Sequence, residues 1–361
     1  MGVPLNDVGR RIQALRPQLD KALSSVLDSG WYVMGRNHDA LEKELAAYLQ
    51  TQHVLLVANG TDALQLALTA LEVGPGDLVL SAANAGGYTS IAAAAIGATP
   101  VYADIDPATM LLTVETLEAA RLRLPRQPSV VVVTHLFGAS ADIAGIVAWA
   151  HAHDIRVVED CAQAIGAIRD GRRVGSFADA ATLSFYPTKN LGALGDAGAV
   201  ATNDPAVAEA VRLLRQYGWT SKYRTGHPRG RNSRCDELQA AVLRVMLPHV
   251  DEWNERRRSI HSRYERAIQG ARLVNASSPA FVGHLAVVES EDRDAARETM
   301  AGLGIGTDIH YPVPDHLQPI AQHTPSLVHT EHAASTIFTI PLFPELRDDE
   351  VDEVCRALER L

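Results

Sequence analysis

The chain has 361 residues, of which 47% are hydrophobic and 21% are charged. This length predicts two domains rather than a single core. The formal net charge of −10, with no block of Lys and Arg, argues against a nucleic-acid partner, which would need many phosphates neutralised. The most apolar stretch, residues 91–105, is interrupted by Gly97 and Pro100 and predicts no membrane span. Three widely spaced cysteines predict reduced thiols and a cytoplasmic location.

The first 20 residues have the pattern of a polar amphipathic helix. From residue 53 onward, short apolar runs alternate with segments of helical periodicity. The predicted strands are 53–57, 77–81, 99–105, 130–134, 156–160, 181–185 and 197–202. Apolar strands separated by helices predict an α/β fold with a mostly parallel seven-stranded sheet between helices. The loop between the last two strands is too short for a crossover helix, so one of them is expected to run antiparallel.

Beyond residue 204 the pattern becomes helical, with a long helix predicted from Asp236 to about Gly270 that leads out of the large domain. A smaller C-terminal α/β domain is expected to follow. Its predicted elements are a strand at 284–290, a helix at 292–303, a strand at 306–312 and a last helix at 348–361. We therefore place the large domain at 1–245 and the small domain at 246–361.

The stretch VANGTDALQLAL, residues 57–68, predicts a strand, a turn and the start of a helix. Free backbone amides at a helix N-terminus attract an anion, and Thr61 adds a hydroxyl next to Gly60. The alternative is an ordinary capped helix, with Thr61 or Asp62 as the cap.

Asp160 lies at the predicted carboxyl end of a strand, where open α/β sheets bind their ligands. A carboxylate at such a place needs a cation or hydrogen-bond donors, and a protonated heterocyclic nitrogen is one suitable partner. Asp160 would otherwise cap the next helix. Gln163, one turn further on, either contacts a ring substituent or faces solvent.

The stretch SFYPTKNLGALGDAG, residues 184–198, places Lys189 among glycines that let the backbone approach a ligand closely. A lysine in a loop is usually solvated. If Lys189 is instead desolvated, its pKa falls and it becomes a nucleophile toward an aldehyde. An anion site, a strand-end Asp and this lysine together are what pyridoxal 5'-phosphate (PLP) requires.

With these motifs the sequence resembles the DegT/DnrJ/EryC1/StrS family of PLP-dependent sugar aminotransferases, which have the fold-type I architecture. The matching stretches are 30–35, 59–64, 75–80, 97–106, 159–167, 184–198, 230–241, 304–312 and 340–346. The resemblance implies that Lys189 bonds to the cofactor aldehyde and later moves a proton, and that Asp160 pairs with the pyridinium nitrogen. It also implies that Gln163 touches the hydroxyl side of the ring.

The family resemblance further implies that Gly60, Thr61 and Ser184 hold the cofactor phosphate. A G-x-N-x-R pattern is met by Gly230, Asn232 and Arg234. In relatives this loop comes from the neighbouring subunit and its Asn reaches the phosphate, so a homodimer with shared active sites is expected.

The sequence departs from the family pattern at two places. Ile165 stands where relatives often have His, and the segment around Tyr88 looks shorter than the family's aromatic motif, so Tyr88 either stacks on the cofactor or packs in the core. The candidates for substrate binding are Tyr32, Tyr186, Arg234, His310 and Tyr311. His310 has a structural alternative in the small domain. Three further basic residues either meet a diphosphate or form a solvated loop: Arg224, Arg229 and Arg231.

The resemblance implies transfer of an amino group from L-glutamate to a keto group of a nucleotide-linked sugar. The residues of the motifs are most like those of enzymes that act on a dTDP-linked 3-keto-6-deoxyhexose. A 4-keto nucleotide sugar, a keto-cyclitol and a non-catalytic regulatory protein of the same fold are the alternatives. A related dehydratase is disfavoured because those enzymes replace the lysine. A nicotinamide dehydrogenase is disfavoured because the G-x-G-x-x-G motif is missing.

Overall fold

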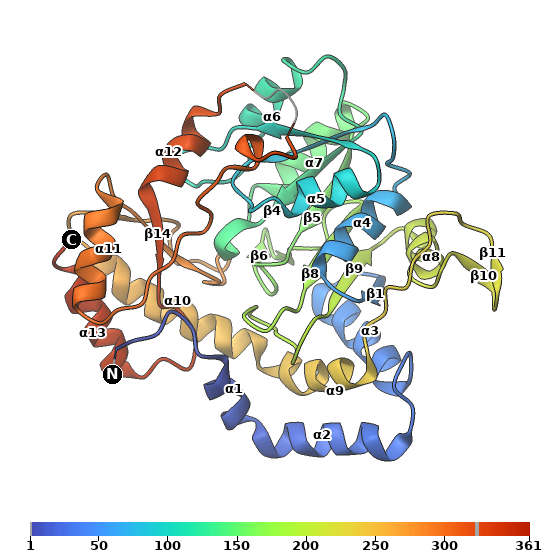
Figure 1. Ribbon diagram of the computed structural model, residues 1–361, viewed down its shortest axis with the longest axis horizontal. Coiled ribbons are helices and arrows are strands. Elements are labelled where there is room, and N and C mark those ends of the chain that lie inside the picture. Colours follow the sequence, from blue (N-terminus) through green and yellow to red (C-terminus); the bar gives the residue numbers. More distant parts are fainter. Residues whose placement is uncertain (1, 322–324) are drawn as a thin grey trace.

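A seven-stranded sheet forms the centre of the protein in the computed structural model, which describes residues 2–321 and 325–361 (Figure 1). The strand order across the sheet is β1-β9-β8-β5-β4-β2-β3. The strands are β1 (His53–Val57), β2 (Leu78–Ala82), β3 (Thr99–Ala103), β4 (Val130–Thr134), β5 (Arg156–Asp160), β8 (Ala180–Ser184) and β9 (Gly198–Thr202). All seven predicted strands are confirmed, with boundaries shifted by at most two residues.

The predicted antiparallel strand is β9. It pairs antiparallel with both β1 and β8, whereas the pairs β8–β5, β5–β4, β4–β2 and β2–β3 are all parallel. The physical reason is the expected one: the loop between β8 and β9 contains no crossover helix, which a parallel connection would need.

Helices cover both faces of the sheet, as apolar residues on both faces require. In β4, Val130 and Val132 pack into one core cluster, while Val131 and Val133 pack into another on the opposite face. The first face carries α4 (Gly60–Ala70), α5 (Tyr88–Ala95) and α8 (Pro205–Leu214). The other face carries α3 (Arg36–Leu49), α6 (Val114–Arg121), α7 (Ile143–Ala152) and α9 (Glu237–Met246).

The N-terminal segment differs from the single helix predicted for it. Helix α1 is Val8–Ala14 and helix α2 is Arg16–Ser29, with Pro17 in the first turn of α2. Residues 2–7 are not helical. Val3 exchanges backbone hydrogen bonds with Gly304 and Gly306. Its side chain joins the hydrophobic core of the C-terminal part of the chain, which is formed by residues between 260 and 358. Burial of Val3 against that core outweighs the local helical pattern.

The predicted long helix is present as α9, a short 3-10 turn at Leu247–His249 and α10 (Val250–Ala267). Together they cross the lower half of Figure 1, above α2. Beyond it lies a three-stranded antiparallel sheet of β12 (Arg272–Leu273), β13 (Ala286–Glu289) and β14 (Ile337–Ile340). Helices α11 (Arg293–Gly302), α12 (Val328–Thr336) and α13 (Asp348–Leu358) accompany it. The division of the chain at 245/246 stays a prediction.

The strand predicted at 306–312 is wrong. Only Asp308 forms an isolated bridge, to Thr339 in β14, and the following residues turn toward the large sheet. The strand that pairs with β13 is Ile337–Ile340 instead. Two short hairpins complete the fold: β6 (Ile168–Arg169) with β7 (Arg172–Arg173), and β10 (Trp219–Ser221) with β11 (Arg224–Thr225). Within the described residues, no helix combines the length and the apolar character that crossing a bilayer requires.

Candidate active site

A cavity of about 910 Å³ opens at the carboxyl ends of the parallel strands. Ten of the predicted site residues line it: Gly60, Thr61, Tyr88, Asp160, Gln163, Ser184, Tyr186, Lys189, His310 and Tyr311. Leu5 and Asn6 add a wall from the N-terminal segment. The C-terminal part closes the cavity with eight residues: His284, Leu285, Asp308, His310, Tyr311, Thr339, Ile340 and Leu342. The cavity therefore lies between the large sheet and the C-terminal part.

Asp160 is the last residue of β5, and its side chain is buried at the cavity floor. One carboxylate oxygen accepts the N–H of Ala162 over 3.1 Å, and the other accepts the hydroxyl of Thr134 over 3.3 Å. Burial raises the pKa of Asp160, while these donors and the charge of Lys189 act in the opposite direction. No helix follows β5 before β6 (Ile168–Arg169), so the alternative that Asp160 caps the next helix is wrong. Asp160 instead accepts a hydrogen bond from the turn after β5 and lines the cavity.

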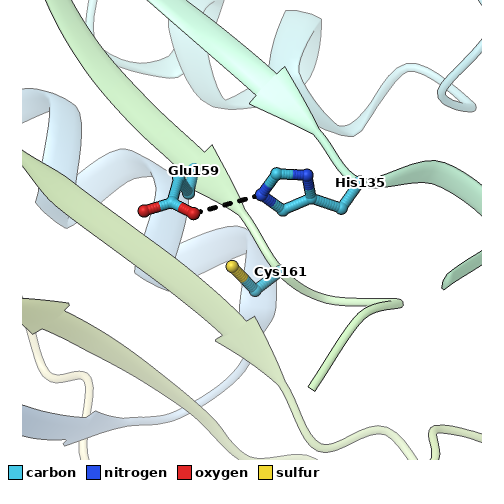
Figure 2. A group of neighbouring side chains, drawn as sticks. All are labelled: His135, Glu159 and Cys161. Atoms are coloured by element: carbon cyan, nitrogen blue, oxygen red, sulfur yellow. Dashed lines mark hydrogen bonds and ion pairs between the residues drawn. The ribbon is translucent and has the colours of Figure 1, made fainter. Parts of the chain in front are cut away.

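Glu159 and Cys161, the neighbours of Asp160 in the sequence, form a buried group with His135 (Figure 2). Glu159 accepts the backbone N–H groups of residues 175, 177 and 178, and lies 3.2 Å from Nε2 of His135. Nδ1 of His135 accepts the N–H of Ala141 over 3.2 Å, so Nε2 carries the proton and donates to Glu159. These hydrogen bonds satisfy the buried carboxylate and fix the end of β5 that carries Asp160.

Lys189 lies in the turn after β8, with its N–H donating to the carbonyl of Tyr186 over 2.8 Å. Desolvation in the cavity lowers the pKa of its amine to about 8, although Asp160 acts to raise it. The buried guanidinium of Arg11 also holds the backbone of this turn. It donates to the carbonyl oxygens of Lys189 over 3.1 Å and Asn190 over 3.4 Å, and to Glu345 over 3.0 Å.

The start of α4 faces the same cavity. Asn59 caps this helix by accepting the N–H of Asp62 over 2.8 Å, so neither Thr61 nor Asp62 is the cap. A Cβ on Gly60 would lie 2.7 Å from Cβ of Ser184. Only glycine lets these two segments come this close, and the result is a helix N-terminus with the hydroxyls of Thr61 and Ser184 lining the cavity beside it.

Gln163 is buried, so it does not face solvent. Its oxygen accepts the N–H of Phe137 over 2.7 Å, and its amide nitrogen donates to the Tyr311 hydroxyl over 3.1 Å. Tyr88 is 48% exposed at the start of α5, which contradicts core packing, and its ring meets that of Tyr311 edge-on at 6.2 Å. His310 hydrogen-bonds Thr339 over 2.9 Å, so it both lines the cavity and contacts β14.

Three predicted residues lie outside the cavity of their own chain: Tyr32, Asn232 and Arg234. Asn232 is exposed, and the guanidinium of Arg234 packs over the ring of Tyr217 at 5.7 Å. Of the neighbouring arginines, Arg229 donates to the carbonyl of Val73 over 2.7 Å and Arg231 lies 3.7 Å from Asp62. These two anchor the loop on α4 and the turn after it, so the solvated-loop interpretation fits only Arg224, which is exposed.

Sequence reasoning missed three residues next to the predicted ones: Arg11, Thr134 and His284. Arg11 is in an amphipathic helix, Thr134 ends a valine run, and His284 precedes a strand. None carries a local pattern that points to a site. The unusual property of Arg11 is that it is buried although its helix is otherwise largely solvent-facing, and burial cannot be read from the sequence.

The sequence from residue 13 to residue 359 matches the model of the DegT/DnrJ/EryC1/StrS aminotransferase family. The chain belongs to this family. It is similar to the dTDP-3-amino-3,4,6-trideoxy-alpha-D-glucose transaminase of Streptomyces venezuelae, with 40% identity over 99% of this chain and 95% of that protein. It is also similar to the erythromycin biosynthesis sensory transduction protein EryC1 of Saccharopolyspora erythraea, with 40% identity over 99% of both chains.

Solved structures of aminotransferases have the same fold. The crystal structure of S. venezuelae DesV in complex with a ketimine intermediate superimposes with a TM-score of 0.95, at 39% identity over 99% of this chain and 98% of that one. The structure of NtdA from Bacillus subtilis with bound cofactor PMP gives a TM-score of 0.93, at 31% identity over 99% of this chain and 85% of that one. The predicted fold class is therefore confirmed.

Proposed function

We propose that the protein uses PLP to move an amino group from L-glutamate to C3 of a nucleotide-linked 3-keto-6-deoxyhexose, with dTDP as the nucleotide. The observation that carries this proposal is the convergence of Lys189, Asp160 and the start of α4 on one cavity. The sugar class comes from a relative at 40% identity that is named for a dTDP-3-amino sugar. Amination at C4 and a keto-cyclitol acceptor are the alternatives.

The cavity fits PLP in three respects. Lys189 offers an amine for the aldehyde, and its pKa of about 8 leaves part of it uncharged near neutral pH. Asp160 offers a carboxylate for the protonated ring nitrogen. Gly60, Thr61 and Ser184 offer backbone amides and hydroxyls for a phosphate. When bound, PLP supplies an electron-withdrawing ring that makes the adjacent C–H of the amine substrate acidic.

The residues of this chain then have defined tasks. Asp160 keeps the ring nitrogen protonated, because a buried carboxylate favours a neighbouring positive charge. Nζ of Lys189 would take the proton from the carbon of glutamate that bears the amine, and would later deliver a proton to the sugar carbon that receives the amine. Gln163 is held by Phe137 and Tyr311 and thereby restricts the space at the ring. The net exchange turns the amine of glutamate into a carbonyl and the keto group of the sugar into an amine.

We infer that the active protein is a homodimer that shares its active sites. Among the described lining residues Lys189 is the only Lys or Arg, so the cavity of one chain offers few cations for a diphosphate. Asn232 and Arg234 lie outside this cavity, on a loop anchored by Arg229 and Arg231. A second subunit that supplies this loop would complete the site. A cytoplasmic location stays a prediction, supported by free cysteines at all three positions.

The test starts from the colour of the protein. PLP bound through Lys189 is expected to give a visible absorbance band that borohydride reduction removes and L-glutamate bleaches. Lys189→Ala should lose amino transfer by at least about a thousandfold, since no other described lysine lines the cavity. Lys21→Ala, which removes an exposed lysine of α2, is the matched control.

Candidate keto sugars are then added with glutamate, and the carbon that gains nitrogen is read by NMR. Amination at C3 supports the proposal, and amination at C4 replaces it with the first alternative. A colourless protein that does not take up PLP would support the regulatory alternative, a role suggested by the name of the EryC1 relative.

A further inference from the structure

His284 is a cavity residue to which neither the sequence motifs nor the proposed reaction gives a task. It lies two residues before β13, lines the same cavity as Lys189 and is otherwise buried. Its Nδ1 is 3.0 Å from the side-chain oxygen of Asn190, the residue that follows Lys189. Nε2, on the other edge of the ring, makes no hydrogen bond to the residues that the structure describes.

Two backbone carbonyls fix the position of the imidazole proton. The side-chain nitrogen of Asn254 donates to the carbonyl of Ile165 over 3.0 Å, so its oxygen faces Asn190. The side-chain nitrogen of Asn190 donates to that oxygen and to the carbonyl of Val282. The oxygen of Asn190 is therefore an acceptor, and Nδ1 of His284 must carry a hydrogen. In the uncharged ring, Nε2 is then a bare acceptor.

The surroundings keep the ring uncharged. Burial lowers the pKa of His284 well below its usual value, and the positive charges of Lys189 and Arg257 act in the same direction. These cations also affect the choice of ligand. A cationic donor beside Nε2 would meet the repulsion of Lys189, Arg257 and Arg11. A neutral hydroxyl has the required hydrogen without the charge.

The position of His284 in the fold points to the sugar rather than to the cofactor. Asp160, Ser184 and the start of α4 contact the cavity from the large sheet, whereas His284 lines it from the C-terminal part together with Asp308 and His310. Asp308 offers another acceptor on that wall. A wall with acceptors is complementary to a ligand rich in hydroxyl groups.

We propose that Nε2 of His284 accepts a hydrogen bond from a ring hydroxyl of the sugar substrate and so contributes to the choice of sugar. This inference rests on the proposed function, because it assumes that a sugar enters the cavity. Asn190 is then a positioning residue, which orients the imidazole from the lysine turn.

Two variants separate this role from a structural one. His284→Asn keeps a donor near the position of Nδ1 for Asn190 but removes the group at Nε2. His284→Gln places an amide oxygen near the position of Nε2 and loses the bond to Asn190. A binding role predicts that only the Asn variant loses affinity for the sugar, whereas a structural role predicts more damage in the Gln variant.

The experiment measures binding of dTDP-glucose and of dTDP to the PLP-loaded protein by calorimetry, with thermal unfolding as a check on both variants. For the wild type, dTDP-glucose should bind more tightly than dTDP. His284→Asn should reduce that ratio about three- to tenfold, which is typical of one neutral hydrogen bond, while the affinity for dTDP alone stays the same. His284→Gln should retain most of the ratio.

A series of dTDP-glucoses that each lack one hydroxyl tests the contact in the wild type without any substitution. One of these analogues should bind to the wild type about three- to tenfold more weakly than dTDP-glucose does. The same analogue should bind to His284→Asn as tightly as dTDP-glucose binds to that variant. The inference is overturned if no member loses affinity, if the glucose adds nothing to the affinity of dTDP, or if the Gln variant is the more damaged. Bleaching of the visible band by L-glutamate is measured separately and reports on the proposed amino transfer alone.

Discussion

The guanidinium of Arg11 donates to the carbonyl oxygen of Lys189 over 3.1 Å, although 178 residues separate them in the sequence. The same side chain donates to Glu345 over 3.0 Å and lies over the ring of Trp253 at 4.7 Å. Helix α1 thereby fixes the backbone of the lysine turn against the C-terminal part. Charge-assisted hydrogen bonds of this kind, made in a buried place, constrain geometry strongly.

Removing this contact should impair catalysis more than cofactor binding. Arg11→Lys keeps the charge but cannot reach both carbonyls and Glu345 at once. We expect kcat to fall about ten- to a hundredfold, because small displacements of a reacting group are costly. Steady-state rates and the PLP dissociation constant are measured beside Arg16→Lys, which changes an exposed ion pair of α2. Wild-type turnover in Arg11→Lys would show that the turn does not depend on this contact.

The amine of Lys189 gives the capture of PLP a defined pH dependence. Its pKa is lowered to about 8 by desolvation, and only the uncharged amine attacks an aldehyde. In stopped-flow mixing of cofactor-free protein with PLP, the capture rate should rise with pH up to about 8 and then level off. A rate that keeps rising toward pH 10 would mean that the amine is solvated like an ordinary lysine.

The same profile tests the coupling of Lys189 to Asp160. Asp160 raises the pKa of the lysine amine through its negative charge. Asp160→Asn removes that charge, so the profile should move to lower pH while amino transfer falls by about a hundredfold or more. A profile that does not move would indicate that the two groups do not interact.

The contact between Gly60 and Ser184 predicts how the cofactor phosphate is held. In Gly60→Ala the new Cβ would lie 2.7 Å from Cβ of Ser184, so the start of α4 and the end of β8 must move apart. We expect PLP to bind at least about fivefold more weakly, since overpacking of this kind costs about 1–3 kcal/mol. Gly302→Ala is the control, because its Cβ would have no neighbour within 4 Å. Equal PLP affinity in both variants would argue against a phosphate at this place.

Mixing two inactive variants tests the shared active site. If Asn232 acts across a dimer, a mixture of Lys189→Ala with Asn232→Ala that is unfolded and refolded together contains mixed dimers with one intact site. Random pairing then restores about a quarter of the wild-type activity. Either variant refolded alone serves as the control. If activity does not return, Asn232 acts within its own chain or not at all.

Much of the large sheet follows from local patterns. Valine runs such as 130–134 predict buried strands whatever surrounds them, because both faces of a central parallel strand are covered. The strand predicted at 306–312 failed because its residues line the cavity and form only one bridge. The helix predicted over residues 2–7 failed for a related reason, since Val3 bridges to Ile305 and is buried in the core cluster of the C-terminal part.

The sequence by itself determined those candidate site residues that depend on residue type next to a strand end or a helix start. These are Lys189, Asp160, Ser184 and the glycine at the beginning of α4, and all four line the cavity. Tertiary structure alone decided that Arg11 holds the lysine turn, that Asn190 orients His284, and that Asn232 lies outside the cavity of its own chain. The physical reason is the sequence distance over which each interaction acts. Helix starts and strand ends are set by neighbours a few residues away, whereas a buried hydrogen bond depends on which distant segments pack together.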